Sequence, residues 1–118
     1  MDQQLIEKIV RALDENKCTD IKVLDVKKIT YIADYFVIAT VRNKPHAEMI
    51  YEKVDEIAFK ETGNPYCRVE GREEGEWVLV DTGDMIVHLF QESARATYNL
   101  DGLWADAEEL DISDWLID

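Results

Sequence analysis

The chain has 118 residues, a net charge of -13 at neutral pH and only two cysteines. This length is sufficient for one domain with its own hydrophobic core, and no apolar stretch approaches the roughly 20 residues that span a bilayer. Such a strong negative charge disfavours broad contact with nucleic-acid phosphates and favours a basic partner that is attracted over a distance.

The first part of the chain predicts a helix followed by two strands. Residues 3 to about 16 carry apolar side chains at the spacing of one helical face, and Asp2 is available as the N-cap. Residues 21–26 are β-branched and partly alternating, which predicts a strand with one more exposed face. Residues 35–41 are apolar throughout, as in a central strand that is covered on both sides. The helix is therefore expected to cover one side of a core that contains this central strand.

A second helix follows the central strand. Pro45 suits its first turn, and Gly63 with Pro65 should end it. The resulting order of strand, helix and strand is that of a βαβ unit. Residues 67–70 are compatible with a short strand, and the charged residues 71–76 read as an exposed turn.

The clearest local pattern is a β-hairpin. Residues 77–81 and 84–90 are strand-like and flank Thr82 and Gly83, a connection of the two-residue hairpin type. If Thr82 and Gly83 form the turn, the cross-strand pairs are Asp81 with Asp84, Val80 with Met85, Leu79 with Ile86, Val78 with Val87, and Trp77 with His88.

The two faces of this hairpin differ in character. One face is uniformly apolar and suited to packing under helices: Val78, Val80, Met85, Val87 and Leu89. The other mixes aromatic, acidic and aliphatic groups: Trp77, Leu79, Asp81, Asp84, Ile86, His88 and Phe90. Such a mixture is typical of a protein-binding patch with aromatic anchors, although a helix covering this face would explain it equally well. Our hypothesis is that the Trp77 end is open, so that Trp77→Ala abolishes partner binding and leaves the melting temperature nearly unchanged.

The C-terminal part is a short helix followed by acidic residues. The helix should span residues 92–98. After Arg95 the chain has no Lys or Arg, while acidic residues accumulate: Asp101, Asp106, Glu108, Glu109, Asp111, Asp114 and Asp118. From about residue 101 the chain therefore reads as an acidic tail, which either keeps the protein in solution or serves as a contact surface.

The sequence lacks the motifs that common catalytic sites require, including a nucleophile elbow, a Walker loop and a His-Glu-x-x-His zinc motif. Asp81 and Asp84 could hold a divalent ion for nucleotidyl transfer, but aspartates beside a tight turn more often bind turn backbone groups. His88 could be a general base or a hydrogen-bonded structural residue, and His46 suits a capping or surface role. We therefore expect no enzyme activity, no catalytic residue, no metal and no cofactor.

The two cysteines and the N-terminus bear on the compartment. Cys18 and Cys67 lie far apart, with no Cys or His at metal-ligand spacing, so we expect two buried free thiols. A disulfide is the alternative, but nothing else in the sequence indicates an oxidising compartment. Residues 1–4 lack the basic region and apolar run of a secretory signal, which predicts a cytoplasmic protein.

Three segments together resemble a known family. They are Asp34-Tyr-Phe-Val-Ile-Ala-Thr40, the hairpin string Trp77-Val-Leu-Val-Asp-Thr-Gly-Asp-Met-Ile-Val-His-Leu-Phe90, and Tyr98-Asn-Leu-Asp-Gly-Leu-Trp104. They resemble the Iojap family, the bacterial and organellar ribosomal silencing factors, and the similarity runs from about residue 4 to residue 106.

The resemblance implies an α/β (α+β) fold with a mixed β-sheet of about five strands flanked by helices, similar to nucleotidyltransferases but without their catalytic site. The chain indeed has no Gly-Ser pair and no Asp-x-Asp motif, which transferases of that fold typically carry. The resemblance also implies a single Iojap-like domain over residues 1–118, which includes the acidic tail from about residue 101. A metal-dependent nucleotidyltransferase and a homodimeric scaffold remain the alternatives.

By the same resemblance, the protein binds the large ribosomal subunit through its universal protein uL-fourteen and sterically blocks subunit joining, which represses translation when nutrients are short. The free protein could be a homodimer. The partner-binding residues expected at matching positions are Trp77, Leu79, Asp81, Asp84, Ile86 and His88. Two departures stand out: Val41–Pro45 replaces the Gly-Asn-Ser segment common in the family, and Thr82 stands where an aromatic residue is common.

Overall fold

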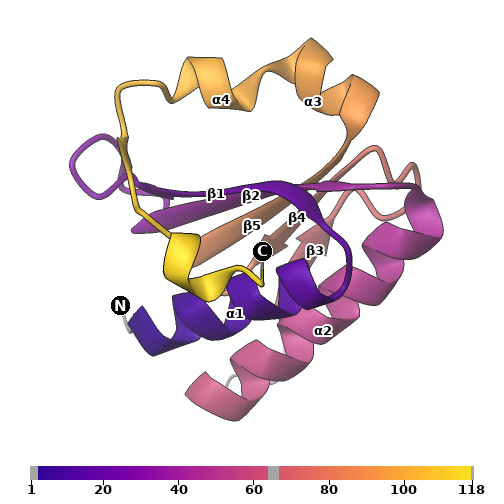
Figure 1. Cartoon of the computed structure of the whole chain (residues 1–118), viewed down its shortest axis with the longest axis horizontal. Helices are drawn as coiled ribbons and strands as arrows, with labels where there is room; N and C mark the ends of the chain where they lie inside the picture. Colours follow the sequence, from indigo (N-terminus) through magenta and orange to yellow (C-terminus); the bar gives the residue numbers. More distant parts are fainter. Residues whose placement is uncertain (1–2, 64–66, 118) are drawn as a thin grey trace.

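The computed structural model describes residues 3–63 and 67–117, and within them one mixed sheet carries flanking helices on both faces (Figure 1). The strands follow the order β3-β4-β5-β2-β1-β6, in which β2 and β5 are parallel and the other neighbours are antiparallel. Their bounds are β1 Thr19–Asp25, β2 Tyr35–Val41, β3 Arg68–Glu70, β4 Trp77–Asp81, β5 Met85–Gln91 and β6 Glu108–Glu109. The expected mixed sheet flanked by helices is confirmed, with the two-residue strand β6 added at one edge.

Two long helices cover one face of the sheet (Figure 1). Helix α1 spans Gln3–Glu15 and buries its apolar stripe as the periodicity predicts, whereas its expected cap, Asp2, lies outside the described residues. Helix α2 spans Lys44–Thr62. The core between these helices and the sheet contains Ile6, Ile9, Val10, Leu13, Val23, Val37, Ile50, Val54, Val80, Met85, Val87 and Leu89, all nearly inaccessible to solvent.

The ends of α2 follow from its sequence. The Asn43 side chain caps the helix by accepting a hydrogen bond from the His46 backbone N–H at 2.9 Å. Gly63 ends it in the left-handed conformation, at φ +76°, where a side chain would be strained. His46 is buried rather than at the surface: its Nδ1 accepts from Arg42 N–H at 2.9 Å, so its Nε2 donates to the Asn16 carbonyl at 2.7 Å. His46 thus ties the end of α1 to the start of α2.

The predicted hairpin is present, but its register differs from the prediction by two residues. Trp77 faces Phe90 instead of His88, because the two-residue turn is formed by Gly83 and Asp84. Thr82 lies just beyond β4 but is already bonded to β5, since its backbone N–H and its hydroxyl both donate to the Met85 carbonyl, at 2.9 and 3.0 Å. A shift of two residues leaves every side chain on its predicted face, because the side-chain period of a strand is two.

Two short helices lie on the opposite face of the sheet (Figure 1). Helix α3 spans Glu92–Tyr98, as predicted, and α4 spans Leu100–Leu103. They cover a second, smaller cluster of buried residues: Leu24, Val26, Ala33, Phe36, Ile38, Ile86, Phe90, Ala94 and Leu100. The Arg95 guanidinium secures α3, donating to Thr40 Oγ1 at 2.8 Å and to the Asp101 carboxylate at 2.9 Å.

The acidic C-terminal segment has more order than its charge predicts. After α4, the chain pairs with the edge of the sheet through β6, which lies beside β1. It then crosses to the other face, where the 3-10 turn η1, Ser113–Trp115, lies next to α1 (Figure 1). Ile112 is buried there, and Leu110 and Trp115 pack against the larger core. These scattered apolar residues anchor the segment while its carboxylates face outward, so it is not simply a solvated tail.

Candidate functional site

The mixed face of the hairpin places the six predicted contact residues at three depths. Trp77, Leu79 and Asp81 are half-buried on β4. Asp84 is exposed in the turn. Ile86 and His88 on β5 are buried, with only 5% and 4% of their surface exposed. The first four are therefore reachable from solvent, and the last two lie beneath them.

Trp77 is the centre of an aromatic group at the edge of this face. Its ring stacks on Phe90 with centroids 4.9 Å apart and lies 4.9 Å from the ring of Tyr98, which is exposed at the end of α3. Its indole Nε1–H donates to His88 Nδ1 at 3.2 Å. We call Trp77, Leu79 and Tyr98, which are reachable from solvent, the aromatic edge, and the buried Phe90 lies beneath them. Its rings hold one another in place, which fixes a rigid apolar surface before any partner arrives.

His88 is a neutral side chain enclosed by aromatic rings. It makes an edge-on contact with Phe36 at 4.9 Å, and burial lowers its pKa from 6.5 to about 4. Because Nδ1 accepts from Trp77, the ring proton lies on Nε2, and this nitrogen has no hydrogen-bond partner among the described residues. A histidine that holds a proton so weakly is a poor base at neutral pH, which favours its structural interpretation over a catalytic one.

The short helices cover only part of the mixed face. Ala94 and Leu100 are buried over its centre, and Trp104 meets Phe36 edge-on, with the ring centroids 5.0 Å apart. Trp77 and Leu79 lie on β4, next to the edge strand β3, and remain half-buried. Both interpretations of this face thus apply: it is covered at the centre and accessible at the edge.

Asp81 and Asp84 have different roles in the hairpin turn. Asp81 Oδ1 accepts the backbone N–H of Gly83 at 2.8 Å, the turn-stabilising role that aspartate commonly has. No group of three or more potential metal ligands occurs in residues 3–63 and 67–117. The Asp81 carboxylate thus stabilises the turn, and the Asp84 side chain is exposed in it.

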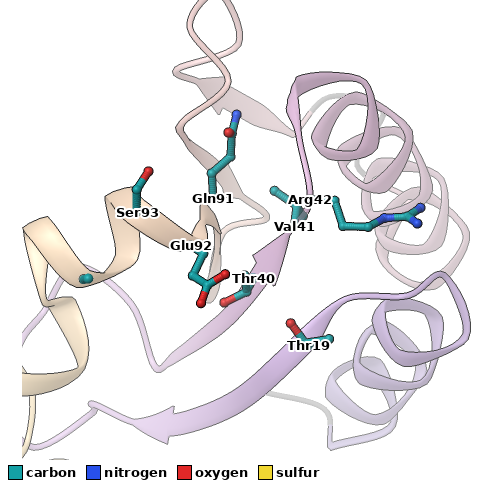
Figure 2. Close-up of a pocket in the computed structure, with 8 residues that line it drawn as sticks. Thr19, Thr40, Val41, Arg42, Gln91, Glu92 and Ser93 are labelled. Carbon is teal, nitrogen blue, oxygen red and sulfur yellow. The ribbon is translucent and has the colours of Figure 1, made fainter.

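A cleft of about 670 Å³ lies outside the carboxyl ends of β2 and β5, and sequence reasoning missed it (Figure 2). These strands are parallel neighbours whose following helices cover opposite faces, and such switch points often hold ligands in α/β folds. The lining includes Thr19, Thr40 and Ser93, whereas the Arg42 side chain points away from the cleft toward α2 (Figure 2). The lining lacks a paired nucleophile and base. The cleft could have been predicted only from the parallel pairing of β2 with β5, and no local sequence pattern indicates that pairing.

Both thiols are expected to react slowly. Burial raises the pKa of Cys18 and Cys67 from 9.0 to about 12, and the Asp55 carboxylate adds to the shift at Cys67. At pH 8 the thiolate fraction falls about a thousandfold, partly offset by the greater nucleophilicity of a more basic thiolate. We therefore expect reaction with an aromatic disulfide reagent at least about thirtyfold slower than for an ordinary thiol. Unfolding in urea should restore the rate, and a fast phase from either thiol in the folded protein would contradict this.

The fold and the site together define a class: an α+β sheet protein whose candidate site is an aromatic edge beside two short covering helices. Within residues 3–63 and 67–117, none of the helices combines the length and the hydropathy of a bilayer span.

Comparison with known proteins identifies the family within this class. The family model described as "Ribosomal silencing factor during starvation" matches residues 1–117, and the chain belongs to this family. It is 38% identical over 113 residues to the ribosomal silencing factor RsfS of Bacillus subtilis, covering 95% of both chains. It is 36% identical over 111 residues to that of Halalkalibacterium halodurans, covering 94% of both. The chloroplastic protein Iojap of Arabidopsis thaliana is 30% identical over 106 residues, which cover 88% of this chain and 43% of that protein.

Solved structures share the fold. A crystal structure from Chromobacterium violaceum matches with a TM-score of 0.79 at 32% identity, covering 89% of this chain and 88% of that one. One from Bacillus halodurans matches with a TM-score of 0.77 at 32% identity, covering 93% and 99%. The expected resemblance to the Iojap family is thereby confirmed. The names of the relatives describe a regulatory role rather than an enzyme.

Proposed function

We propose that this protein represses translation in the cytoplasm by binding the large ribosomal subunit through the universal protein uL-fourteen and blocking subunit joining. Family membership supports a ribosomal partner. The observation that carries the site assignment is the accessible aromatic edge around Trp77, because rigid aromatic anchors supply most of the binding energy in many protein interfaces.

The charge of the protein supports a basic ribosomal protein as the direct contact. A chain of net charge -13 is repelled by RNA phosphates and attracted by a cationic protein surface between them. The exposed Asp84 and the half-buried Asp81 lie at the turn end of the strands that carry the aromatic edge. These two carboxylates give the turn end of the hairpin a negative electrostatic potential, which attracts a basic partner before contact.

The repression itself needs no chemistry. The described chain has a radius of gyration of 13.0 Å and extends 32 × 30 × 29 Å. A body of that size bound on the surface that meets the small subunit prevents close docking. The direct test is light scattering of subunit joining with and without the purified protein, together with its co-sedimentation with isolated large subunits. Failure to sediment with those subunits, or unchanged joining at saturating protein, would refute the proposal.

Charge reversal at Asp84 tests the attraction. No cation lies within ion-pair distance of Asp84 among the described residues, so Asp84→Lys should leave the fold intact. We expect association with the large subunit to slow about three- to tenfold at low salt, and by less at physiological salt, because ions screen the attraction.

Glu52→Lys is the matched control, since Glu52 is exposed on α2, on the other side of the sheet, and its replacement changes the net charge equally. Stopped-flow association rates of both variants should separate local from overall charge. Equal rates for the two variants would mean that Asp84 does not face the partner.

A further inference from the structure

An apolar groove lies at the C-terminal end of α4, the second of the two covering helices. It has a volume of about 260 Å³ and is lined by Ile29, Leu103, Trp104 and Asp106. Ile29 comes from the loop between β1 and β2, and the other three come from the end of α4 and the segment that follows it. Figure 1 shows this loop and this segment on the same side of the molecule.

The walls of this groove are unusually exposed for apolar side chains. Ile29 is 48% exposed, Leu103 is 75% exposed, and Ile32 on the same loop is 67% exposed. Trp104 forms the floor, because it is half-buried and held by its edge-on contact with Phe36. Large apolar groups gathered around a hollow, in a protein with a well-packed core, usually mark an interaction surface.

The rim of the groove is acidic. A neighbouring cleft of about 300 Å³ is lined by Asp25, Lys28, Ile29, Asp106 and Glu108, so Ile29 and Asp106 belong to both hollows. Asp106 and Glu108 are exposed, and no cation pairs with either of them in the described part of the chain. The third carboxylate, Asp25, is paired with Lys27 at 3.7 Å. Lys28 is the one cation among the residues that line this neighbouring cleft. An apolar hollow with unpaired carboxylates beside it fits an occupant that is apolar at one point and basic around it.

We propose that this groove, lined by Ile29, Leu103, Trp104 and Asp106, is a docking site for a basic protein segment with one bulky apolar side chain. The apolar side chain enters between Ile29 and Leu103 and rests on the Trp104 ring. Flanking Lys or Arg side chains meet Asp106 and Glu108. The site is separate from the aromatic edge, and binding of a basic segment here does not depend on binding of the large subunit there.

A short peptide tests this directly. The probe has a central leucine, a glycine on each side of it and two lysines at each end, and matched peptides carry alanine for the leucine or glutamate for the lysines. We expect the leucine peptide to bind about tenfold more tightly than the alanine peptide, from the apolar area it buries. The glutamate peptide should not bind. In NMR titrations of the full chain, the indole N–H signal of Trp104 should shift and that of Trp115, on the other face, should not.

Variants locate the binding to the groove. Leu103→Ser should weaken the leucine peptide at least about fivefold, because it removes an apolar wall. Phe59→Ser is its control, since Phe59 is an apolar residue on α2 that is also at least half exposed. Asp106→Asn with Glu108→Gln should weaken it about fivefold at low salt, whereas Glu48→Gln with Glu52→Gln on α2 should have much less effect.

Three results would overturn the proposal. They are an unmoved Trp104 signal, equal affinity of the leucine and alanine peptides, and equal effects of Leu103→Ser and Phe59→Ser. Equal affinity of the two peptides would show general charge attraction without a docking site. None of these results bears on subunit joining, so the outcome is independent of the proposed ribosomal function.

Discussion

Acidification from pH 6.5 to pH 4 is expected to cost this protein about 3 kcal/mol of folding stability through His88 alone, and replacement by leucine should remove that loss. His88 is enclosed by Phe36, Trp77 and Phe90, and burial lowers its pKa to about 4. In the unfolded chain the same ring titrates near 6.5. Between these two values the unfolded state binds the proton and the folded state does not.

The sign follows from that difference. Where the unfolded state binds more protons, the free energy of unfolding rises with pH. The contribution of His88 is therefore complete above about pH 6.5, declines as the pH falls and is exhausted near pH 4. Asp101 acts in a lower range: its pKa is lowered, chiefly by the Arg95 hydrogen bond, so its contribution is present above the ordinary carboxyl pKa and is lost below it. The two effects are thus separated along the pH axis.

Urea denaturation at several pH values measures this. The net charge of -13 adds a background, since protonating carboxylates relieves repulsion, and that background is shared by wild type and His88→Leu. The difference between their free energies of unfolding should therefore change by about 3 kcal/mol between pH 6.5 and pH 4. Parallel curves across this range would show that His88 is not enclosed as the structure places it.

The hairpin shows what local sequence predicts and where it fails. The alternation of apolar and mixed side chains assigns each residue of β4 and β5 to its face, because one buried face fixes the parity of the pairing. The position of the turn is harder to predict, because either Thr82 or Asp84 could join Gly83 in the two-residue turn. The threonine hydroxyl and N–H both donate to the Met85 carbonyl, which bonds Thr82 to β5 and leaves Gly83 and Asp84 as the turn. These hydrogen bonds of Thr82 form only when β5 lies beside it, so the types of the turn residues alone do not predict them.

The C-terminal segment and the cover of the mixed face depend on distant contacts. Ile112 and Trp115 lie among carboxylates in the sequence, and no periodicity distinguishes them. Ile112 joins the core and Trp115 packs against it because the chain passes the sheet edge and reaches α1. The sequence likewise left open whether a helix covers the mixed face. Helices α3 and α4 are too short to cover all of it, so Ile86 and His88 are buried while Trp77 and Leu79 stay accessible. The identity of the candidate residues was thus predictable, and their depth was not.

Trp77→Ala should lower the affinity for the large ribosomal subunit about a hundredfold or more, the effect of removing an aromatic hot spot from an interface. The structure also predicts a cost in stability, where the sequence alone led us to expect almost none. Trp77 stacks on Phe90 and contacts Tyr98, and it donates to His88, so its loss should destabilise the fold by about 2 to 3 kcal/mol. A weaker fold and a lost contact must therefore be distinguished.

Two further variants make that distinction. Ile57→Ala, at a half-buried position on α2 across the sheet, should destabilise by about 2 kcal/mol and leave binding unchanged, because both proteins remain overwhelmingly folded. Trp77→Phe keeps an aromatic ring for the stack but lacks the indole N–H and part of its area, so its affinity should lie between those of wild type and alanine. Equal loss of binding in Trp77→Ala and Ile57→Ala, at matched stability, would mean that the aromatic edge supports the fold and that the ribosomal contact lies on another surface.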